Sequence, residues 1–279
     1  MIGPIEGYTA KLVVWYQGEA NVGRKSTYET YFNALKESFK KAFSNDDLKF
    51  FAIQLAPYTS NQGDFLSVQY DLAEADDTFV ISTSREGPTF NSSDLANGVI
   101  HPSRKSPVGH RLADSVLKNV YGLYEGEVVE APKVVSVTRD GNKLIITFDT
   151  SLSLAYGNAL LGFEIAGSDK SFKTAVGEIS GNTVILTADG VDAPQYVRYG
   201  FGCMEIVLKD GTVLPYDSKL SNSVSNTSAD KAVIVGPDGT QYVFNGDPSL
   251  VVETRLAGNL TNGSGHPMPT FMLEVGYVK

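Results

Sequence analysis

Two segments of the sequence carry polar residues whose types and spacing could do chemistry. In the first, "LVVWYQGEAN", an apolar run gives way to Gln17, Gly18, Glu19 and Asn21. A glycine lets the backbone approach a ligand with its N–H free to face an oxyanion, and the amides of Gln17 and Asn21 can donate to the same place. Tight turns are rich in the same residue types for reasons of backbone geometry alone. The segment therefore admits both an oxyanion-binding and a plain turn interpretation.

The second segment, "GVIHPSRKSPVGHRLA", places His101 in a loop just before a helix. An imidazole held there could act as a general base, although a lone loop histidine can equally be structural. The chain has two other histidines. His110 falls inside the amphipathic helix, where a surface or packing role is expected. His266 lies in a Gly/Asn/Pro-rich tail and could be exposed to solvent.

The elements that must position these residues alternate between strand and helix. Apolar runs of strand length occur at 11–16, 49–56 and 78–83. Helical patterns follow them at 26–43, 65–75 and 106–121. The first helix is expected to open with a capping box at Ser26, and the last with Ser106 as its N-cap. This alternation predicts an α/β fold with a mostly parallel, helix-covered sheet, in which the run at 11–16 is a central strand. Its polar residues then lie at the carboxyl-end rim, where such sheets bind ligands.

The composition changes after Tyr124, where short β-prone runs separated by turn dipeptides begin. Four segments have the pattern of hairpins around Asp-Gly or Gly-Asn, at 134–148, 175–188, 204–216 and 231–244. They predict an antiparallel, β-sandwich-like domain. We therefore expect an incomplete α/β domain over 1–124, an antiparallel β domain over 125–220, and a linker with a β-rich extension over 221–279.

Composition excludes several classes of function. The net charge of -9 disfavours nucleic acid as a partner, because phosphate binding needs a basic surface. A single cysteine, Cys203, rules out an internal disulfide, and no Cys/His cluster resembles a metal site. No apolar run approaches the roughly 18–20 residues that span a bilayer, and no signal peptide is visible. We expect no metal, no cofactor and no membrane partner, and the sequence leaves the compartment open.

Taken together, the polar segments resemble the sialate O-acetylesterase group of SGNH-type hydrolases. The stretches "MIGPIEGYTAKLVVWYQGEANVGR", "FFAIQLAPY" and "IHPSRKSPVGHRLA" stand in the order and spacing typical of that family. The resemblance extends from residue 1 to about residue 215. It implies a partial SGNH or flavodoxin-like α/β fold, and release of acetate from O-acetylated sugars or glycans by Ser–His acyl transfer without a cofactor.

The resemblance also implies roles for individual residues. His101 would be the general base for a serine nucleophile, while Gln17, Gly18, Glu19 and Asn21 would line the site beside the oxyanion hole. SGNH enzymes often place an aspartate three residues before the histidine, a position that is Gly98 here. Asp94 is the nearest acid upstream, and it is either the third member of the triad or a solvated loop residue.

The serine of that family lies in a "GQSN"-like block upstream of the "WYQGE" strand. Neither that block nor a Gly-x-Ser-x-Gly elbow occurs in the sequence, and serines such as Ser168 have turn contexts. We therefore expect the C-terminal part of an esterase, whose serine is carried by a separate polypeptide or missing through truncation. A sheet of three strands would then leave an exposed edge and apolar face.

The alternative is a non-catalytic carbohydrate-binding or interaction protein that uses the β-rich half. Tyr196, Tyr199 and Phe201 could then form a sugar-stacking face, although alternating aromatic residues on a strand can equally belong to the core. A degenerate remnant without activity is a third option.

Overall fold

The structure is a computed structural model. It describes residues 3–57, 62–84, 105–201, 210, 212 and 258–279, and the backbone of 204–208, 213–216, 232–235, 241–244 and 251–256. The first part of the chain contains a parallel three-stranded sheet, which confirms the predicted α/β pattern. Its strands are β1 (Leu12–Trp15), β2 (Lys49–Ile53) and β3 (Thr78–Ile81), in the order β1-β2-β3.

The prediction that the first strand is central is wrong for the described sheet, because β2 is the central strand. Both crossovers step in the same direction away from β1, so β1 stays at an edge. Its residues are only partly buried, and Val14 is 44% exposed. The expectation of an exposed edge beside an apolar surface is therefore confirmed for the described residues.

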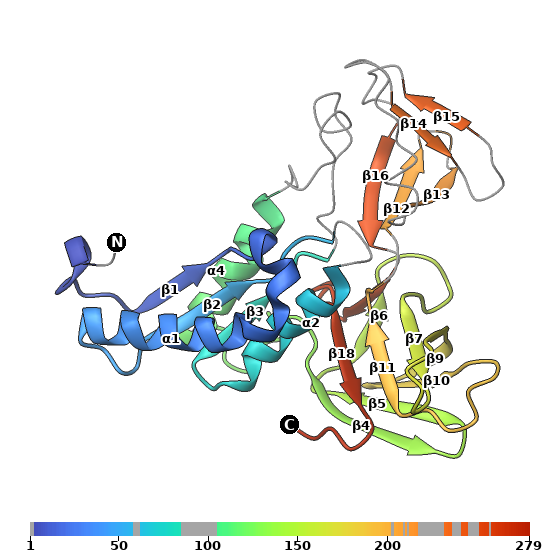
Figure 1. Cartoon of the computed structure of the whole chain (residues 1–279), viewed down its shortest axis with the longest axis horizontal. Helices are drawn as coiled ribbons and strands as arrows, with labels where there is room; N and C mark the ends of the chain where they lie inside the picture. Colours follow the sequence, from blue (N-terminus) through green and yellow to red (C-terminus); the bar gives the residue numbers. More distant parts are fainter. Residues whose placement is uncertain are drawn as a thin grey trace.

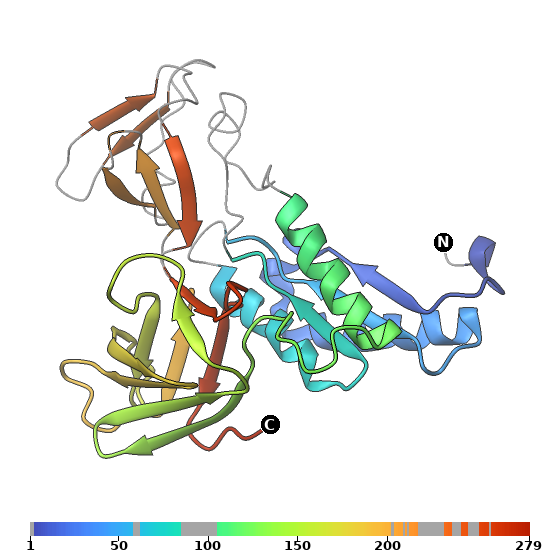
Figure 2. The same cartoon turned by 180° about the vertical axis from the view of Figure 1, so that it is seen from behind.

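Helices cover both faces of this sheet (Figures 1 and 2). They are α1 (Lys25–Phe43), α2 (Gly63–Asp71) and α4 (Ser106–Tyr121), with 3-10 turns η1 (Gly3–Ile5), η2 (Glu19–Arg24) and η4 (Leu72–Glu74). Phe32 of α1 and Phe65 of α2 pack with Phe50 on one face. Val108 of α4 packs with Phe51 on the other. Because neighbouring residues of a strand point to opposite faces, β2 is buried by helices on both sides.

Two helix starts differ from the sequence prediction. Helix α1 begins at Lys25, and its N-cap Arg24 makes no side-chain capping bond. The predicted capping box at Ser26 is wrong, because the turn η2 leads directly into the helix and places Ser26 inside the first turn. Helix α4 begins at Ser106 with Pro107 in the first turn, but its N-cap is Lys105. Its end is as predicted, with Gly122 in the left-handed conformation.

The second part of the chain contains two four-stranded antiparallel sheets. The first has the order β4-β5-β10-β9, formed by β4 (Val134–Asp140), β5 (Lys143–Phe148), β10 (Thr183–Thr187) and β9 (Val176–Ser180). The second has the order β18-β11-β7-β8, formed by β18 (Phe271–Glu274), β11 (Tyr196–Tyr199), β7 (Phe163–Ala166) and β8 (Lys173–Thr174). Ile146 and Val184 of the first sheet share one hydrophobic cluster with Ile165, Val197 and Phe271 of the second.

Smaller sheets complete the described chain. They comprise β6 (Leu152–Leu154) with β17 (Leu260–Asn262), β14 (Ala232–Val235) with β15 (Gln241–Phe244), and β12 (Met204–Leu208) between β13 (Val213–Tyr216) and β16 (Val251–Leu256). All four predicted hairpins are confirmed as antiparallel pairs. The proposed boundaries after residues 124 and 220 stay a prediction.

Direct hydrogen bonds join the α/β part to the antiparallel part. The Gln54 side chain donates to the Thr270 carbonyl at 2.8 Å and accepts from the Thr270 N–H at 3.0 Å. The Met272 N–H donates to the Ser67 hydroxyl at 2.9 Å. Gln54 follows β2, Ser67 lies in α2, and both partners belong to the region of β18. The contacts hold the carboxyl-end rim of the parallel sheet against the antiparallel sheets.

Candidate functional site

The backbone that follows β1 is fixed at the rim by two side chains. The Gln17 carbonyl accepts hydrogen bonds from the Tyr28 hydroxyl at 2.9 Å and from Gln69 Nε2 at 3.1 Å. The Trp15 indole N–H in turn donates to the Tyr28 oxygen at 3.2 Å. Burial, ahead of the charge of Glu19, raises the pKa of Tyr28, so its hydroxyl stays protonated and can donate.

Gly18 occupies a position that no other residue fits. Its φ is 155°, and a Cβ built there would lie 2.6 Å from the Phe65 ring and 3.1 Å from Gln69 Nε2. The Gly18 carbonyl also accepts a bond from the Asn21 N–H at 2.7 Å, which closes the turn. A glycine is therefore required by backbone conformation and packing together. Because residue 18 has no side chain, its backbone can lie close to α2 at the rim of the sheet.

The polar side chains of this turn lie within reach of one another. Gln17 Nε2 donates to Asn21 Oδ1 at 2.7 Å, and both residues are half-buried. In the part of the chain that the structure describes, Asn21 Nδ2 has no hydrogen-bond partner. Glu19 is exposed, and its charge acts with burial, the larger cause, to raise the pKa of Tyr16. The turn thus presents amide donors beside one carboxylate.

Three buried glutamines form a support behind the rim that sequence reasoning missed. Gln69 accepts from the Leu55 N–H at 2.8 Å while it donates to Gln17, so it joins the ends of β1 and β2. Gln54 ties the same rim to Thr270. Gln62, at the start of α2, has an Oε1 without a hydrogen-bond partner, and among the described residues it is alone in this respect among fully buried side-chain nitrogen and oxygen atoms. The sequence signal was an amide directly after an apolar strand, as in "AIQL".

The rim after β3 carries buried hydroxyl groups. Ser82 donates to the Ser84 hydroxyl at 3.1 Å, and Thr83 donates to the Gln54 carbonyl at 2.8 Å. His101 and Asp94 lie outside the described residues, in the segment that connects β3 to α4. The structure therefore brings Gln17, Gly18 and Asn21 together, with Glu19 exposed beside them, and provides no geometry for the histidine and its acid.

The other residues considered in the sequence analysis differ in their exposure to solvent. His110 is exposed on α4, as expected, and Ser168 is exposed in a turn. His266 is half-buried rather than open to solvent, because residues 258–279 fold back onto the antiparallel sheets. Tyr199 and Phe201 are 1% and 5% exposed, so only Tyr196 of the three aromatic residues reaches the surface.

The described residues contain neither a metal-binding cluster nor a membrane-spanning helix. No group of three or more His, Cys, Asp or Glu side chains there could hold a metal ion. None of the helices in the described ranges combines the length and apolar character needed to cross a membrane.

The chain is similar to a solved structure of another protein. It is a carbohydrate acetylesterase from Xanthomonas citri, which matches this chain with 25% sequence identity and a TM-score of 0.69. The match covers 98% of this chain and 52% of the esterase, so this chain spans about half the length of that enzyme. No protein-family model and no curated protein matches the sequence. The similarity supports an esterase-like fold.

Proposed function

We propose that this protein is a carbohydrate O-acetylesterase. The observation that carries the proposal is the similarity to a carbohydrate acetylesterase, which extends over nearly the whole chain. A second support is the amide-rich turn at the carboxyl-end rim, the place where α/β sheets bind ligands. The substrate would be an acetylated sugar or glycan.

In finer detail, we propose a sialate O-acetylesterase-like member of the SGNH hydrolases. Residues 1–124 would be part of the hydrolase domain, 125–220 a β-sandwich-like domain and 221–279 its extension. The Gly18 N–H and the amides of Gln17 and Asn21 would stabilise the oxyanion, and Glu19 would line the substrate site. His101 would act as the base, with Asp94 as the candidate for the residue that orients it.

The proposed reaction is a two-step acyl transfer. His101 takes the proton of a serine hydroxyl as the serine oxygen attacks the acetyl carbonyl, and the proton then passes to the departing sugar oxygen. Water attacks the acetyl-serine in the second step, with His101 again accepting and returning the proton. The products are acetate and the free sugar hydroxyl, so no cofactor is needed.

We propose that the serine lies outside these 279 residues, in a segment that completes the sheet at β1. The open edge of β1 supports this proposal. Leu12 packs on the face covered by α4, and Val14 and Tyr16 follow on the same face because side chains alternate along a strand. Val14 and Tyr16 are nevertheless 44% and 37% exposed. A further strand and its covering helix would bury them, and the similar esterase is long enough to contain such elements.

The test is acetate release from O-acetylated sugars, measured for this chain alone and after co-expression with the polypeptide encoded immediately upstream of Met1. We expect activity only in the second case. His101→Ala should then lower kcat/KM by about 10²–10⁴-fold, since a general base contributes that much. The matched control is His110→Ala, an exposed histidine on α4 that should leave the rate unchanged. Equal effects of the two variants would refute the proposed base.

The alternative, a carbohydrate-binding module without catalysis, would need exposed aromatic rings on the β-rich half. Burial of Tyr199 and Phe201 removes two of its three candidate rings. Sugar binding by the full chain, without turnover under any co-expression, would favour this alternative.

A further inference from the structure

The turn after β1 contains a backbone donor without a partner. Gly18 is buried, yet its N–H has no hydrogen-bond partner in the described part of the chain. Buried backbone N–H groups are almost always paired, because an unpaired one costs free energy. The Gly18 carbonyl, by contrast, accepts a hydrogen bond from the Asn21 N–H at 2.7 Å. The N–H of Gly18 therefore remains available to a ligand at the carboxyl-end rim.

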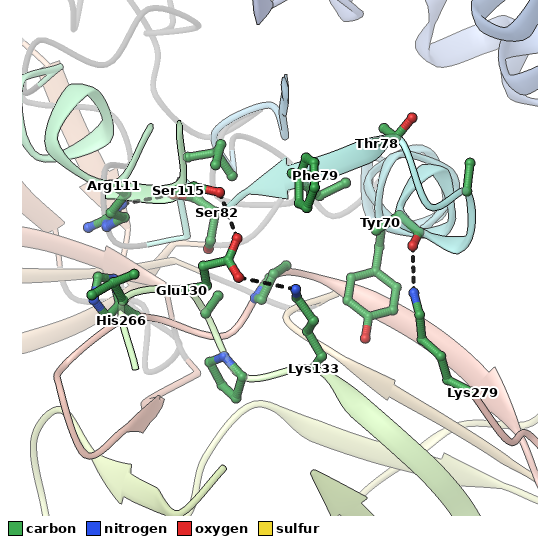
Figure 3. Close-up of a pocket in the computed structure, with 18 of the residues that line it drawn as sticks. Tyr70, Thr78, Phe79, Ser82, Arg111, Ser115, Glu130, Lys133, His266 and Lys279 are labelled. Carbon is green, nitrogen blue, oxygen red and sulfur yellow. Dashed lines mark hydrogen bonds and ion pairs between the residues drawn. The ribbon is translucent and has the colours of Figure 1, made fainter. Parts of the chain in front are cut away.

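A cavity of about 200 Å³ between β3, α4 and the segment that leads into β4 differs in this respect, because its charged groups are engaged (Figure 3). Glu130 accepts hydrogen bonds from Ser115 at 2.6 Å and from Lys133 at 3.3 Å. The ammonium group of Lys279 lies 3.7 Å from the carboxylate of Glu74. These pairs satisfy each other within the protein, whereas the donor in the turn after β1 does not have such a partner.

The carbonyl of the same peptide group is held from two helices. The Gln17 carbonyl accepts hydrogen bonds from the Tyr28 hydroxyl of α1 at 2.9 Å and from Gln69 Nε2 of α2 at 3.1 Å. The Gln17–Gly18 peptide bond is trans, and the N–H and C=O of a planar trans peptide group point in opposite directions. Fixing the carbonyl therefore also fixes the Gly18 N–H, which points away from Tyr28 and Gln69.

The orientation of the Gln69 amide is set by its two partners. Its Oε1 accepts from the Leu55 N–H at 2.8 Å, while its Nε2 faces the Gln17 carbonyl. An N–H can only donate and a carbonyl can only accept, so the amide cannot exchange its nitrogen and oxygen without losing both bonds. Gln69 is 1% exposed, so it cannot turn toward solvent without leaving buried groups unpaired.

The direction of the Tyr28 hydrogen bond is fixed in a similar way. The Trp15 indole N–H donates to the Tyr28 oxygen at 3.2 Å. Because an indole N–H cannot accept, the phenolic proton is left for the Gln17 carbonyl. The Tyr28 ring also packs edge-on against Phe65, with 4.7 Å between the ring centroids. Phe65 is the ring that excludes a side chain at Gly18, so one aromatic contact positions both the tyrosine and the turn.

Two hydrogen bonds to the carbonyl also make the N–H a stronger donor. Bonds accepted by a carbonyl polarise the peptide group, and cooperative strengthening is about 10–30% per bond. A donor to an oxyanion is most effective when its position is fixed before the reaction, because no reorganisation is then needed as the charge develops. The peptide group between Gln17 and Gly18 meets both conditions.

We propose that Tyr28 and Gln69 are positioning residues that hold the Gln17–Gly18 peptide group so that the Gly18 N–H meets the oxyanion of the tetrahedral intermediate. This inference rests on the proposed esterase function. Neither side chain touches the substrate, and Trp15 acts one step further back by orienting Tyr28. Because the oxyanion forms only as the serine attacks, the two residues act on kcat rather than on substrate binding.

The first measurement is made by NMR on the full chain alone. It records the carbonyl ¹³C signal of Gln17 and the amide signals of Gly18. Tyr28→Phe and Gln69→Met each remove one donor from the carbonyl with little change in side-chain volume. Each variant should move the signals in the direction of a weaker hydrogen bond, and the double variant should move them further.

The matched control is Tyr70→Phe, which also removes one buried hydroxyl group. The Tyr70 hydroxyl accepts a hydrogen bond from the Val134 N–H at 3.2 Å, so the control loses a comparable bond that does not involve Gln17. Thermal melts establish that the variants are folded. The control should leave the signals of Gln17 and Gly18 in place.

The second measurement is acetate release after co-expression with the polypeptide encoded upstream of Met1. We expect Tyr28→Phe and Gln69→Met to lower kcat about 10- to 100-fold with KM within about twofold, because the Gly18 N–H is still present but no longer fixed. A merely structural role would reduce the amount of folded protein and leave kcat per folded molecule unchanged. Tyr70→Phe should keep the kcat of the unchanged protein.

The outcomes distinguish this inference from the esterase proposal. Inactivity of the unchanged co-expressed protein would refute the esterase and, with it, the catalytic role of both side chains. If the unchanged protein is active, the positioning role alone is overturned when Tyr28→Phe and Gln69→Met keep kcat within about twofold or raise only KM. It is also overturned, whatever the activity, if neither variant moves the signals of Gln17 and Gly18.

Discussion

Replacing Gly18 by alanine tests how the rim beside the proposed oxyanion site is built. The backbone of residue 18 has a φ of 155°, which L residues rarely adopt. The new methyl group would also lie 2.6 Å from the Phe65 ring. Unfavourable backbone conformations cost about 1–3 kcal/mol, and overpacking a core costs about as much again. We expect Gly18→Ala to lower the free energy of unfolding by about 3–5 kcal/mol, and the melting temperature by about 10 °C.

The matched control is Gly23→Ala in the same turn η2. Nothing lies within 4 Å of a Cβ at position 23, and its backbone conformation is open to alanine. This variant should be neutral or stabilised by up to about 1 kcal/mol, because alanine restricts the unfolded chain. Denaturant unfolding followed by circular dichroism measures both free energies under the same conditions.

A second substitution separates the cost of the unfavourable backbone conformation in Gly18→Ala from the cost of overpacking. Phe65→Leu shortens the side chain that meets the new methyl group, so the double variant with Gly18→Ala should recover about 1–2 kcal/mol relative to additivity. The backbone cost would remain. If the free energy of unfolding of Gly18→Ala lies within about 1 kcal/mol of that of the unchanged protein, backbone conformation and packing do not require a glycine at this position.

Two aspartates should affect stability with opposite dependence on pH. Burial raises the pKa of Asp77, but hydrogen bonds from Lys36, Lys40 and Thr78 outweigh it and bring the pKa to about 2. Its contribution is therefore fully present above about pH 4 and lost as the pH falls through 2, so Asp77→Asn should cost about 3 kcal/mol at pH 7, about half as much at pH 3 and little at pH 2. Burial first, and then nearby carboxylates, raise the pKa of Asp71 to about 7. Stability is then lost as the pH rises through 7, so Asp71→Asn should stabilise the protein by about 2 kcal/mol at pH 8 and by little at pH 4. Free energies of unfolding measured for both variants across this pH range check the two predictions. The predictions would be contradicted if the effects of Asp77→Asn and Asp71→Asn changed with pH in the same direction.

Elements with strong local patterns could be predicted from the sequence. The stripe of Tyr28 and Phe32 identifies the buried face of α1, and the hairpins follow from turn dipeptides between alternating runs. Each of these patterns is formed by residues that are close together in the sequence. The glycine at position 18 was also recognised, although the reason for it, contact with Phe65 of α2, became visible only in three dimensions.

Features that depend on distant contacts could not be predicted. The pairing of Gln54 with Thr270 joins residues 216 positions apart, and no local pattern marks it. A continuous apolar run such as "LVVWY" has the same appearance in a central strand and in an edge strand that awaits a neighbour, so the position of β1 was misjudged. The half-buried state of His266 likewise depends on the return of the chain to the antiparallel sheets.

The most direct test of the proposed esterase is the identity of its nucleophile. The protein co-expressed with its upstream-encoded polypeptide would be treated with a serine-reactive fluorophosphonate, and the labelled peptide identified by mass spectrometry. The account predicts one labelled serine outside residues 1–279, with labelling much reduced in His101→Ala and unaffected in His110→Ala. Labelling of a serine within this chain, such as Ser82 or Ser84, or labelling that is indifferent to His101, would contradict it.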